Sequence, residues 1–214
     1  MKPIFYLLLL LLFSCGNKKT IQLPSIQNAQ VTEVHDVSAA YLFYNETQPD
    51  SVELNRKNLI STTNWLVNVD KRLTLEQAIP QIKLLQDRKR NAKMHKNDNA
   101  KNYFSCNDTS IKNLGFIEFT NVHYQMFENG LDALKSVIPE TSQMVLLSQA
   151  STITIKGHDF SDIETALKTI KHQPLDLVLC FNKDMTFEDY ITYKSRFNAL
   201  ELDSISISSD EFIY

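Results

Sequence analysis

The sequence predicts an α+β protein in which helices pack on one face of a mixed sheet to form two-layer domains. Three observations lead to this fold class. Strand-like and helix-like segments follow one another in the order ββαβαβ in the second half of the chain. Each helix-like segment there has a single apolar stripe, which suits a helix that covers one side of a sheet. Part of the same pattern occurs earlier in the chain, which indicates a possible internal duplication.

A hairpin and a helix begin this order. Apolar runs predict strands at residues 144–148 and 152–155, and Gly157 marks the turn that ends the hairpin. Ser161 and Glu164 have the spacing of a capping box, so we expect a helix to begin there. This helix has an apolar stripe formed by Ile163, Ala166, Leu167 and Ile170.

An apolar strand, a polar turn and a capped helix then follow at residues 177–191, and the same three features occur at residues 65–79. Alignment of the two segments pairs identical residue types at four positions: Lys71 with Lys183, Thr74 with Thr186, Glu76 with Glu188, and Ile79 with Ile191. The paired threonines occupy the N-cap position of each helix. Pro80 is expected to kink the first helix or to move its start. Each unit then ends in an alternating strand, at residues 115–120 in the first and 204–208 in the second.

The beginning of the chain has the pattern of an export signal. Lys2 precedes an unbroken apolar run over residues 4–13, which is shorter than the roughly 20 residues that cross a bilayer. The run ends in Leu12-Phe13-Ser14-Cys15, which resembles the lipobox of bacterial lipoproteins. The resemblance implies cleavage before Cys15 and lipid attached to its thiol and to the new amino terminus. The alternative is an ordinary secretory signal with a chance cysteine.

These features divide the chain into four expected parts. Residues 17–32 are mostly polar and lack an apolar period, which is typical of a tether. The parts are a signal peptide at 1–14, a lipid-anchored tether at 15–37, a first α+β unit at 38–125 with a basic insertion near 83–113, and a second α+β unit at 126–214.

The second unit also resembles a known family. From Met144 to Tyr214 its order is similar to the periplasmic domain of the ExbD/TolR biopolymer-transport family, and the match includes the Gly157 turn and the strand that opens at 174–178. The resemblance implies a dimerising, peptide-contacting module. Members of that family keep a membrane helix with a proton-carrying aspartate, whereas residues 1–14 here contain no acidic residue. The resemblance therefore does not imply a motor subunit.

The two cysteines beyond the lipobox, Cys106 and Cys180, are not expected to pair with each other. Cys180 lies in an apolar strand and is predicted to be in the core, whereas Cys106 is predicted to lie in a polar loop, Ser105-Cys106-Asn107-Asp108. A core thiol and a loop thiol make an unfavourable pair for a disulfide.

The sequence shows no motif for catalysis or for a cofactor. Its four glycines are too far apart for a phosphate-binding loop, and it has no HExxH or CxxC. None of the five histidines has the spacing of a zinc site. We therefore expect no catalytic residue, no metal and no cofactor, although a catalytic set assembled from distant residues leaves no such motif.

A basic segment at residues 83–101 stands out in a chain whose net charge is −3. It is interpreted first as a solvated helical extension, because charge runs are usually solvated. The alternative is a contact surface for anionic lipid or another envelope polymer. Its candidate contact residues are Arg88, Lys89, Arg90 and Lys93. Nucleic acid is excluded as a partner by the export signal and by the lack of interleaved aromatic residues.

Two functions are expected from these observations. The first is a lipid-anchored, non-catalytic protein of the cell envelope, facing the periplasm, that binds or scaffolds another envelope protein or a second copy through its sheet edges. The second is an envelope hydrolase or transferase with a scattered active site. Such a site is expected in a cleft between the two halves, lined by Asp70 and Asp184.

Overall fold

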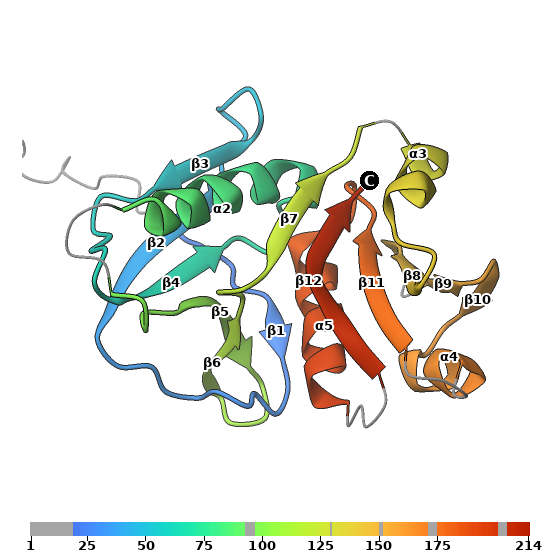
Figure 1. Cartoon of the computed structure of the whole chain (residues 1–214). Coiled ribbons are helices and arrows are strands. Elements are labelled where there is room, and N and C mark those ends of the chain that lie inside the picture. The colour runs from blue at the N-terminus through green and yellow to red at the C-terminus, as the bar shows by residue number, and fades with distance from the viewer. Residues whose placement is uncertain (1–18, 93–96, 129, 150–151, 171–174, 201–204) are drawn as a thin grey trace, which may run out of the picture.

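The structure is a computed structural model of the whole chain, and it describes residues 19–92, 97–128, 130–149, 152–170, 175–200 and 205–214. The expected signal peptide, Cys15 and Lys93 lie outside these residues. The fold is α+β, with two six-stranded mixed sheets side by side (Figure 1).

The first sheet is built from the first half of the chain. Its strands are β1 (Ser25–Ile26), β2 (Val37–Tyr44), β3 (Val52–Asn55), β4 (Asn64–Val69), β5 (Asn102–Asp108) and β6 (Asn113–Glu118). The order is β1-β5-β4-β2-β3, and β6 also pairs with β5. Strands β2, β4 and β5 run parallel, and β3 and β6 are antiparallel to their neighbours. Helix α2 (Leu75–Arg90) makes the crossover from β4 to β5.

The second sheet is built from the second half. Its strands are β7 (His123–Met126), β8 (Ser142–Leu147), β9 (Ile153–Ile155), β10 (His158–Phe160), β11 (Leu175–Phe181) and β12 (Ile205–Ile213). Their order is β10-β9-β8-β11-β12-β7. The helices are α3 (Gly130–Val137), α4 (Ile163–Ile170) and α5 (Phe187–Ala199), and α5 connects β11 to β12.

The two sheets share one plan. The run β3-β2-β4-β5-β1 corresponds to β9-β8-β11-β12-β7, with the same parallel and antiparallel pairings at each step. Helices α2 and α5 make equivalent crossovers. The second unit adds α3, β10 and α4, and the first unit adds β6. The repeat expected from sequence is therefore present in the fold of the described residues.

The helix starts agree with the expected caps at α2 and α5. Thr74 and Gln77 form a complete capping box, and Thr186 accepts a hydrogen bond from the backbone of Asp189. Helix α2 begins at Leu75 although Pro80 lies inside it, so the proline does not move its start. At α4 the side chain that bonds the first turn is Asp162, which accepts from the backbone of Thr165 at 2.9 Å, one residue later than the expected cap at Ser161.

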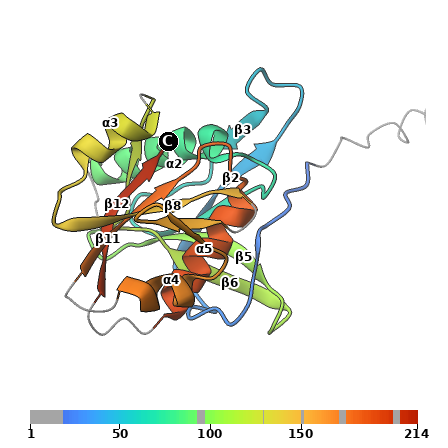
Figure 2. The ribbon, with the colours of Figure 1, turned by 90° about the vertical axis from the view of Figure 1, so that its right-hand side faces the viewer.

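One hydrophobic core joins the two halves. Phe104 of β5 stacks on Phe119 with 3.8 Å between ring centroids, and it meets Phe187 of α5 edge-on at 5.2 Å. A single cluster of buried side chains includes residues of both sheets, of α2 and of α5. A smaller cluster on the opposite face of the second sheet holds Leu134 of α3 against Val178. Helix α3 thus covers the face that α4 and α5 leave open (Figure 2), which adds a layer to the expected one-sided packing.

The structure corrects the interpretation of the segment that follows α2. Cys106 is not in a loop but fully buried in β5, among the core residues of the first sheet. Strand β5, and not residues 115–120, corresponds to the closing strand β12, because β5 pairs parallel with β4 as β12 does with β11. The expected basic insertion near 83–113 is therefore the end of α2, a connection and β5. The polar neighbours of Cys106 concealed a strand, in which the carboxylate of Asp108 bonds to the backbone of Ala29 and to Ser110.

The structure also changes two of the boundaries expected between the parts of the chain. The division between residues 125 and 126 cuts through β7, which belongs entirely to the second sheet. The expected tether at 15–37 does not extend freely from residue 19 onward, because β1 pairs with β5 and the amide of Ala29 donates to Asp108 at 2.7 Å. Gly115 lets this segment approach β6, since a Cβ there would lie 2.5 Å from the Cβ of Ala29. Cys106 and Cys180 are both free and buried.

Candidate functional site

The place expected for a cleft between the halves is filled by the two turns that precede α2 and α5. Their backbones bond reciprocally, as in an isologous contact. Leu75 N donates to Met185 O at 2.9 Å, and Phe187 N donates to Leu73 O at 2.7 Å. Glu76 N likewise donates to Lys183 O at 2.9 Å, and Glu188 N to Lys71 O at 3.2 Å. The amides at each helix start, which have no partner within their own helix, thus donate to carbonyls of the other turn, and these bonds close the junction.

The side chains around these turns repeat the reciprocity. Lys183 Nζ lies 3.1 Å from Glu76 Oε1, and Lys71 Nζ lies 3.6 Å from Glu188 Oε2. Both lysines are partly exposed, so these ion pairs contribute modestly to stability. Each turn thus pairs its lysine with the glutamate at the start of the other unit's helix.

Asp70 and Asp184 are the residues expected to line a catalytic cleft. The hydrogen bonds at both residues hold the local fold. Asp70 is fully buried and accepts hydrogen bonds from Arg72 Nε at 2.8 Å and Arg72 Nη2 at 2.9 Å. Its carboxylate also accepts from the backbone amides of Arg72 and Gln22. Burial alone would raise the pKa of Asp70, but these hydrogen bonds lower it overall. Asp184 is exposed, and its carbonyl accepts a hydrogen bond from Gln149 at 2.6 Å.

Asp70 has a counterpart in the second unit, and the comparison explains its role. Asn182 occupies the equivalent position, and its side-chain oxygen accepts from the backbone of Asp184 at 2.8 Å, as Asp70 accepts from the backbone of Arg72 at 3.1 Å. Both side chains close the same turn between strand and helix. The carboxylate of Asp70 therefore holds the turn and the segment at Gln22, and it does not meet Asp184 in a shared cleft.

The basic candidates separate into different environments. Arg88 is exposed on α2, and Lys93 lies outside the described residues. Arg90 donates to the carbonyl of Thr120 at 3.2 Å and to that of Val122 at 2.9 Å. The guanidinium of Arg90 therefore bonds the connection to β7, although its side chain is exposed.

Lys89 does not lie on a contact surface. Its side chain is buried, and Nζ donates to Thr63 O at 3.2 Å, to Lys101 O at 2.9 Å and to Asn102 Oδ1 at 2.9 Å. The ammonium also lies 4.9 Å from the centre of the Trp65 ring. Burial lowers the pKa of Lys89 to about 8. Lys89 thus joins α2 to two strands of the first sheet, and its expected role as an anion contact is wrong.

A second buried polar cluster lies in the second unit, and it was not anticipated from sequence. Tyr190 of α5 donates to Glu211 of β12 at 2.8 Å, and its hydroxyl lies 3.0 Å from that of Tyr124 of β7. Lys194 forms an ion pair with the other oxygen of Glu211, and all four side chains are buried. Burial, together with the charge of Glu211, raises the pKa of Tyr190 well above its usual value. The cluster links one helix to two strands with its polar atoms mutually bonded.

A sequence signal for both polar clusters exists. Lys194 follows Tyr190 by one turn, and Lys89 follows Leu85 by one turn, so each lysine falls on the apolar face of its helix. A charged residue on a stripe that faces the core predicts a buried partner.

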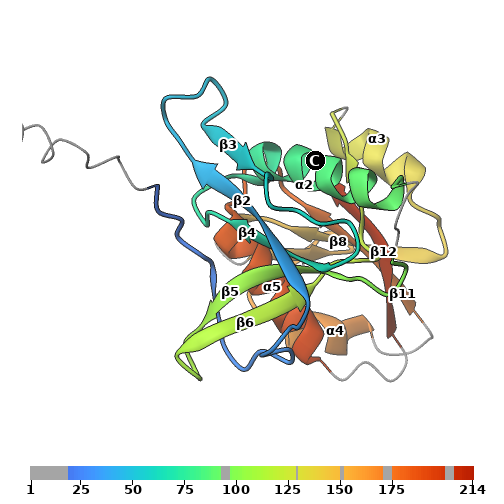
Figure 3. The ribbon, with the colours of Figure 1, turned by 90° about the vertical axis from the view of Figure 1, so that its left-hand side faces the viewer.

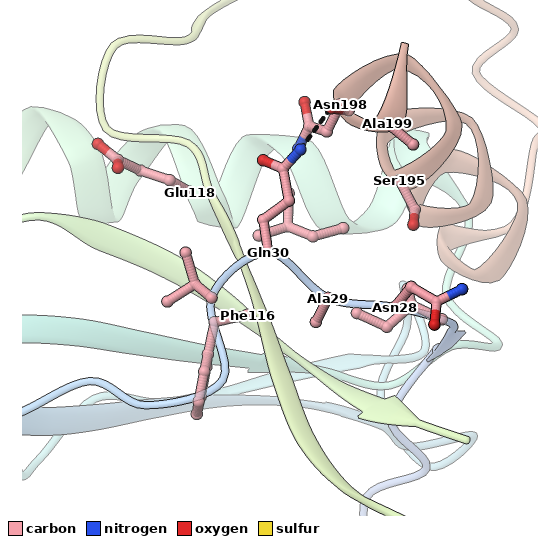
Figure 4. A pocket seen from close by; sticks show the side chains of 11 residues that line it. Asn28, Ala29, Gln30, Phe116, Glu118, Ser195, Asn198 and Ala199 are labelled. Carbon is pink, nitrogen blue, oxygen red and sulfur yellow. Dashed lines mark hydrogen bonds between the residues drawn. The ribbon is translucent and has the colours of Figure 1, made fainter. Parts of the chain in front are cut away.

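A surface pocket of about 140 Å³ lies between the N-terminal segment, β6 and the end of α5. Figure 4 shows Gln30 reaching across it to the backbone of Asn198, where its amide donates at 2.6 Å. Glu118 is the one titratable side chain among the lining residues, and it is paired with Lys101 at 2.8 Å. The pocket therefore brings no set of acid, base and nucleophile together.

Several sheet edges are occupied. Lys83 donates to the carbonyl of Tyr124 on β7 at 3.3 Å, and Gln86 donates to that of Val122 at 3.0 Å. Phe116 of β6 donates to Val31 at 2.9 Å. Among the described strands, β3 and β10 also lie at sheet edges, and they have four and three residues.

Within the described part of the chain, no group of three or more His, Cys, Asp or Glu side chains could hold a metal ion. None of the helices described is long and apolar enough to cross a membrane.

Comparison with protein-family models, with curated proteins and with solved structures gave no match. The class of the protein therefore follows from its fold: an α+β protein made of two like units that meet at their strand-to-helix turns. The similarity of the second unit to the ExbD/TolR periplasmic domain stays a prediction.

Proposed function

We propose that this protein is a lipid-anchored, non-catalytic binding module of the cell envelope. The observation that carries the proposal is the sequence Leu12-Phe13-Ser14-Cys15 at the end of a short apolar run. A lipid on Cys15 would hold the folded units at a membrane surface, and the export signal would place them in the periplasm.

The surroundings of the polar residues support a binding role over the alternative of a scattered active site. Asp70 is bonded by Arg72 and by the backbone of Gln22, and Lys89 is bonded by three oxygens. The junction between the units is closed by backbone hydrogen bonds. Groups held in this way maintain the fold and are poorly placed to exchange protons with a substrate.

The partner in this proposal is another envelope protein or a second copy of the chain. Strand addition at β3 or β10 supports such contacts through main-chain hydrogen bonds. Because both edges are short, few hydrogen bonds form at either, and side chains must supply the rest of the affinity.

The anchor is tested by changing the lipobox cysteine. We expect Cys15→Ser to leave an uncleaved precursor or to release the protein from the membrane fraction, measured by fractionation and by the mass of the purified protein. Cys106→Ala is the matched control, because it removes a thiol that lies in the core, and it should leave processing and acyl mass unchanged. Full membrane retention of a normally processed Cys15→Ser protein would refute the proposal.

A further inference from the structure

The outer face of the first sheet is apolar along a whole strand. In β2 the side chains of Ala40 and Leu42 are fully buried, and the alternate positions point to the other face. Those outer positions are Val37, Ala39, Tyr41 and Phe43, and none of them is fully buried. Tyr41 and Phe43 stack on that face with 5.9 Å between ring centroids. A strand that is apolar on both faces is typical of a sheet that is covered on both sides.

The neighbouring strands continue this face. Ala39 pairs with Leu66 of β4, and Leu66 pairs with Tyr103 of β5. Tyr103 lies edge-on to Phe116 of β6, with 6.4 Å between ring centroids. Residues directly opposite each other in paired strands project to the same side. A row of apolar side chains therefore crosses the outer face from β2 to β6.

Polar residues flank this row on the same face, among them Asn64 and Asn68 of β4 and Glu118 of β6. The row is more exposed at β2 and β4, because Tyr103 and Phe116 are themselves buried.

The equivalent face of the second sheet has a cover. There Val178 and Cys180 occupy the positions of Leu66 and Asn68, and Leu134 of α3 packs on them and is fully buried. In the first unit, none of the described helices lies in front of β2, β5 and β6 (Figure 3). The described part of the first unit thus lacks the helix that covers this face in the second unit.

The start of the described chain lies at this face. Lys19 forms an ion pair with Glu53 of β3, and Glu53 is the cross-strand partner of Phe43. Cys15 precedes Lys19 by four residues, which span at most about 14 Å at about 3.5 Å per residue. A lipid on Cys15 would therefore hold the edge of this face close to the membrane.

The charges on the face agree with that position. Glu53 is paired with Lys19, and Glu118 at the opposite edge is paired with Lys101. A tyrosine such as Tyr41 favours the boundary between lipid and water, because its ring is apolar and its hydroxyl polar.

We propose that the outer face of the first sheet, formed by β2, β4, β5 and β6, rests on the lipid surface to which Cys15 is anchored. This inference rests on the proposed lipid anchor and adds an orientation to it. The second unit then points away from the membrane, with β10 at the far end of the molecule (Figure 1).

The test uses the full-length, processed protein in vesicles of phosphatidylethanolamine and phosphatidylglycerol that contain nitroxide-labelled lipid. Single cysteines for an environment-sensitive fluorophore are introduced by Phe43→Cys or Val37→Cys on the outer face, and by His158→Cys on β10 as the matched control. Cys106 and Cys180 are buried and should stay unlabelled. Val37 is 43% exposed, so its variant keeps the test valid where Phe43→Cys disturbs folding.

We expect both outer-face labels to be quenched at least about twofold more strongly than the label at residue 158, because apolar interfacial faces enter about 5–10 Å into the lipid boundary. Quenching equal to that at residue 158, in protein whose mass shows the acyl chains, would overturn the orientation and leave the anchor intact. Protein without acyl mass would refute both the anchor and this inference. Outer-face labels that are shielded without lipid, in protein that sediments as a dimer, would assign the face to a second copy and overturn the lipid contact.

Discussion

The turns that join β4 to α2 and β11 to α5 have the same hydrogen bonds, but the helices that follow them have different interiors. Ala78 and Ile82 of α2 are buried apolar residues, whereas the equivalent positions of α5 hold Tyr190 and Lys194, which are also buried. The same backbone pattern of turn and helix cap is thus compatible with a purely apolar helix face and with a buried face that carries polar and charged side chains. A buried charge requires a partner of opposite charge, and Glu211 is that partner for Lys194.

The largest effect should come from removing one charge of the buried cluster in the second unit. Lys194→Ala leaves Glu211 buried without its ion-pair partner and should cost about 3–5 kcal/mol of unfolding free energy. The double change Lys194→Met with Glu211→Leu should cost much less, because no charge is then left buried. Denaturant unfolding measures both. A loss below about 1 kcal/mol for Lys194→Ala would mean that water reaches this carboxylate, since surface changes cost that little.

The next largest loss of stability is expected from truncating an isoleucine that both units have at the same position of the helix. Ile79 and Ile191 are equivalent and fully buried, so Ile79→Ala and Ile191→Ala should each cost about 2–5 kcal/mol. Because one core cluster joins both units, each variant should shift a single unfolding transition. Calorimetry that resolves two transitions, each sensitive to one variant only, would show instead that the units unfold independently.

A smaller change makes the first turn resemble the second. Asp70→Asn places in the first unit the residue type found at Asn182, keeps the bond to the backbone of Arg72, and loses the bidentate ion pair. We expect a cost of about 1–2 kcal/mol at pH 7, at the lower end for hydrogen bonds to charged groups because Arg72 is partly exposed.

The same variant has a pH signature. The pKa of Asp70 is lowered in the folded protein by its hydrogen bonds, so its stabilisation is present above the unfolded pKa of about 4 and is lost as the pH falls through the lower folded value. The difference in unfolding free energy between pH 7 and acid should therefore be smaller for Asp70→Asn than for the parent. An unchanged difference would contradict the assigned ion pair.

The smallest effect on stability is expected at Arg88, the exposed candidate for an anion contact. Arg88→Glu should change the unfolding free energy by less than about 0.5 kcal/mol. If Arg88 touches an anionic surface, the reversal should weaken binding to anionic vesicles by at least about 1 kcal/mol. Lys89→Met is the contrasting variant, because it leaves three oxygens without their donor and should destabilise the fold. Equal stability of the two variants would contradict the buried position of Lys89.

The sequence predicts the repeated unit because the unit depends on local rules. A threonine at each helix start, an apolar strand before it and a stripe after it are all visible within about fifteen residues, and the structure confirms them. Strand β5 was missed because its signal is not local. Its serine, asparagine and aspartate side chains are typical of a loop, and they lie in a strand only because β4, β6 and β1 supply hydrogen-bond partners from elsewhere in the chain.

The candidate site was less predictable for the same reason. The role of Asp70 depends on Gln22, and that of Lys89 depends on the carbonyls of Thr63 and Lys101. A basic run describes charge along the chain, whereas a contact surface requires the charges to project outward. The helical period separates Arg88 from Lys89 by about 100° around α2, so one is exposed and the other is buried.

The reciprocal turns have a consequence for the order in which the chain can fold. Residues 71–76 and 183–188 lie about half the chain apart, yet each segment supplies carbonyl groups to amides of the other. Contacts between such distant segments form late, because closing a long loop is entropically unfavourable and slow. Backbone amides of the first unit therefore lack their carbonyl partners until the second segment has been synthesised. Its assembly is complete only after α5 has formed, and until then Phe104 of β5 lacks the aromatic cover that Phe187 and Tyr190 give it.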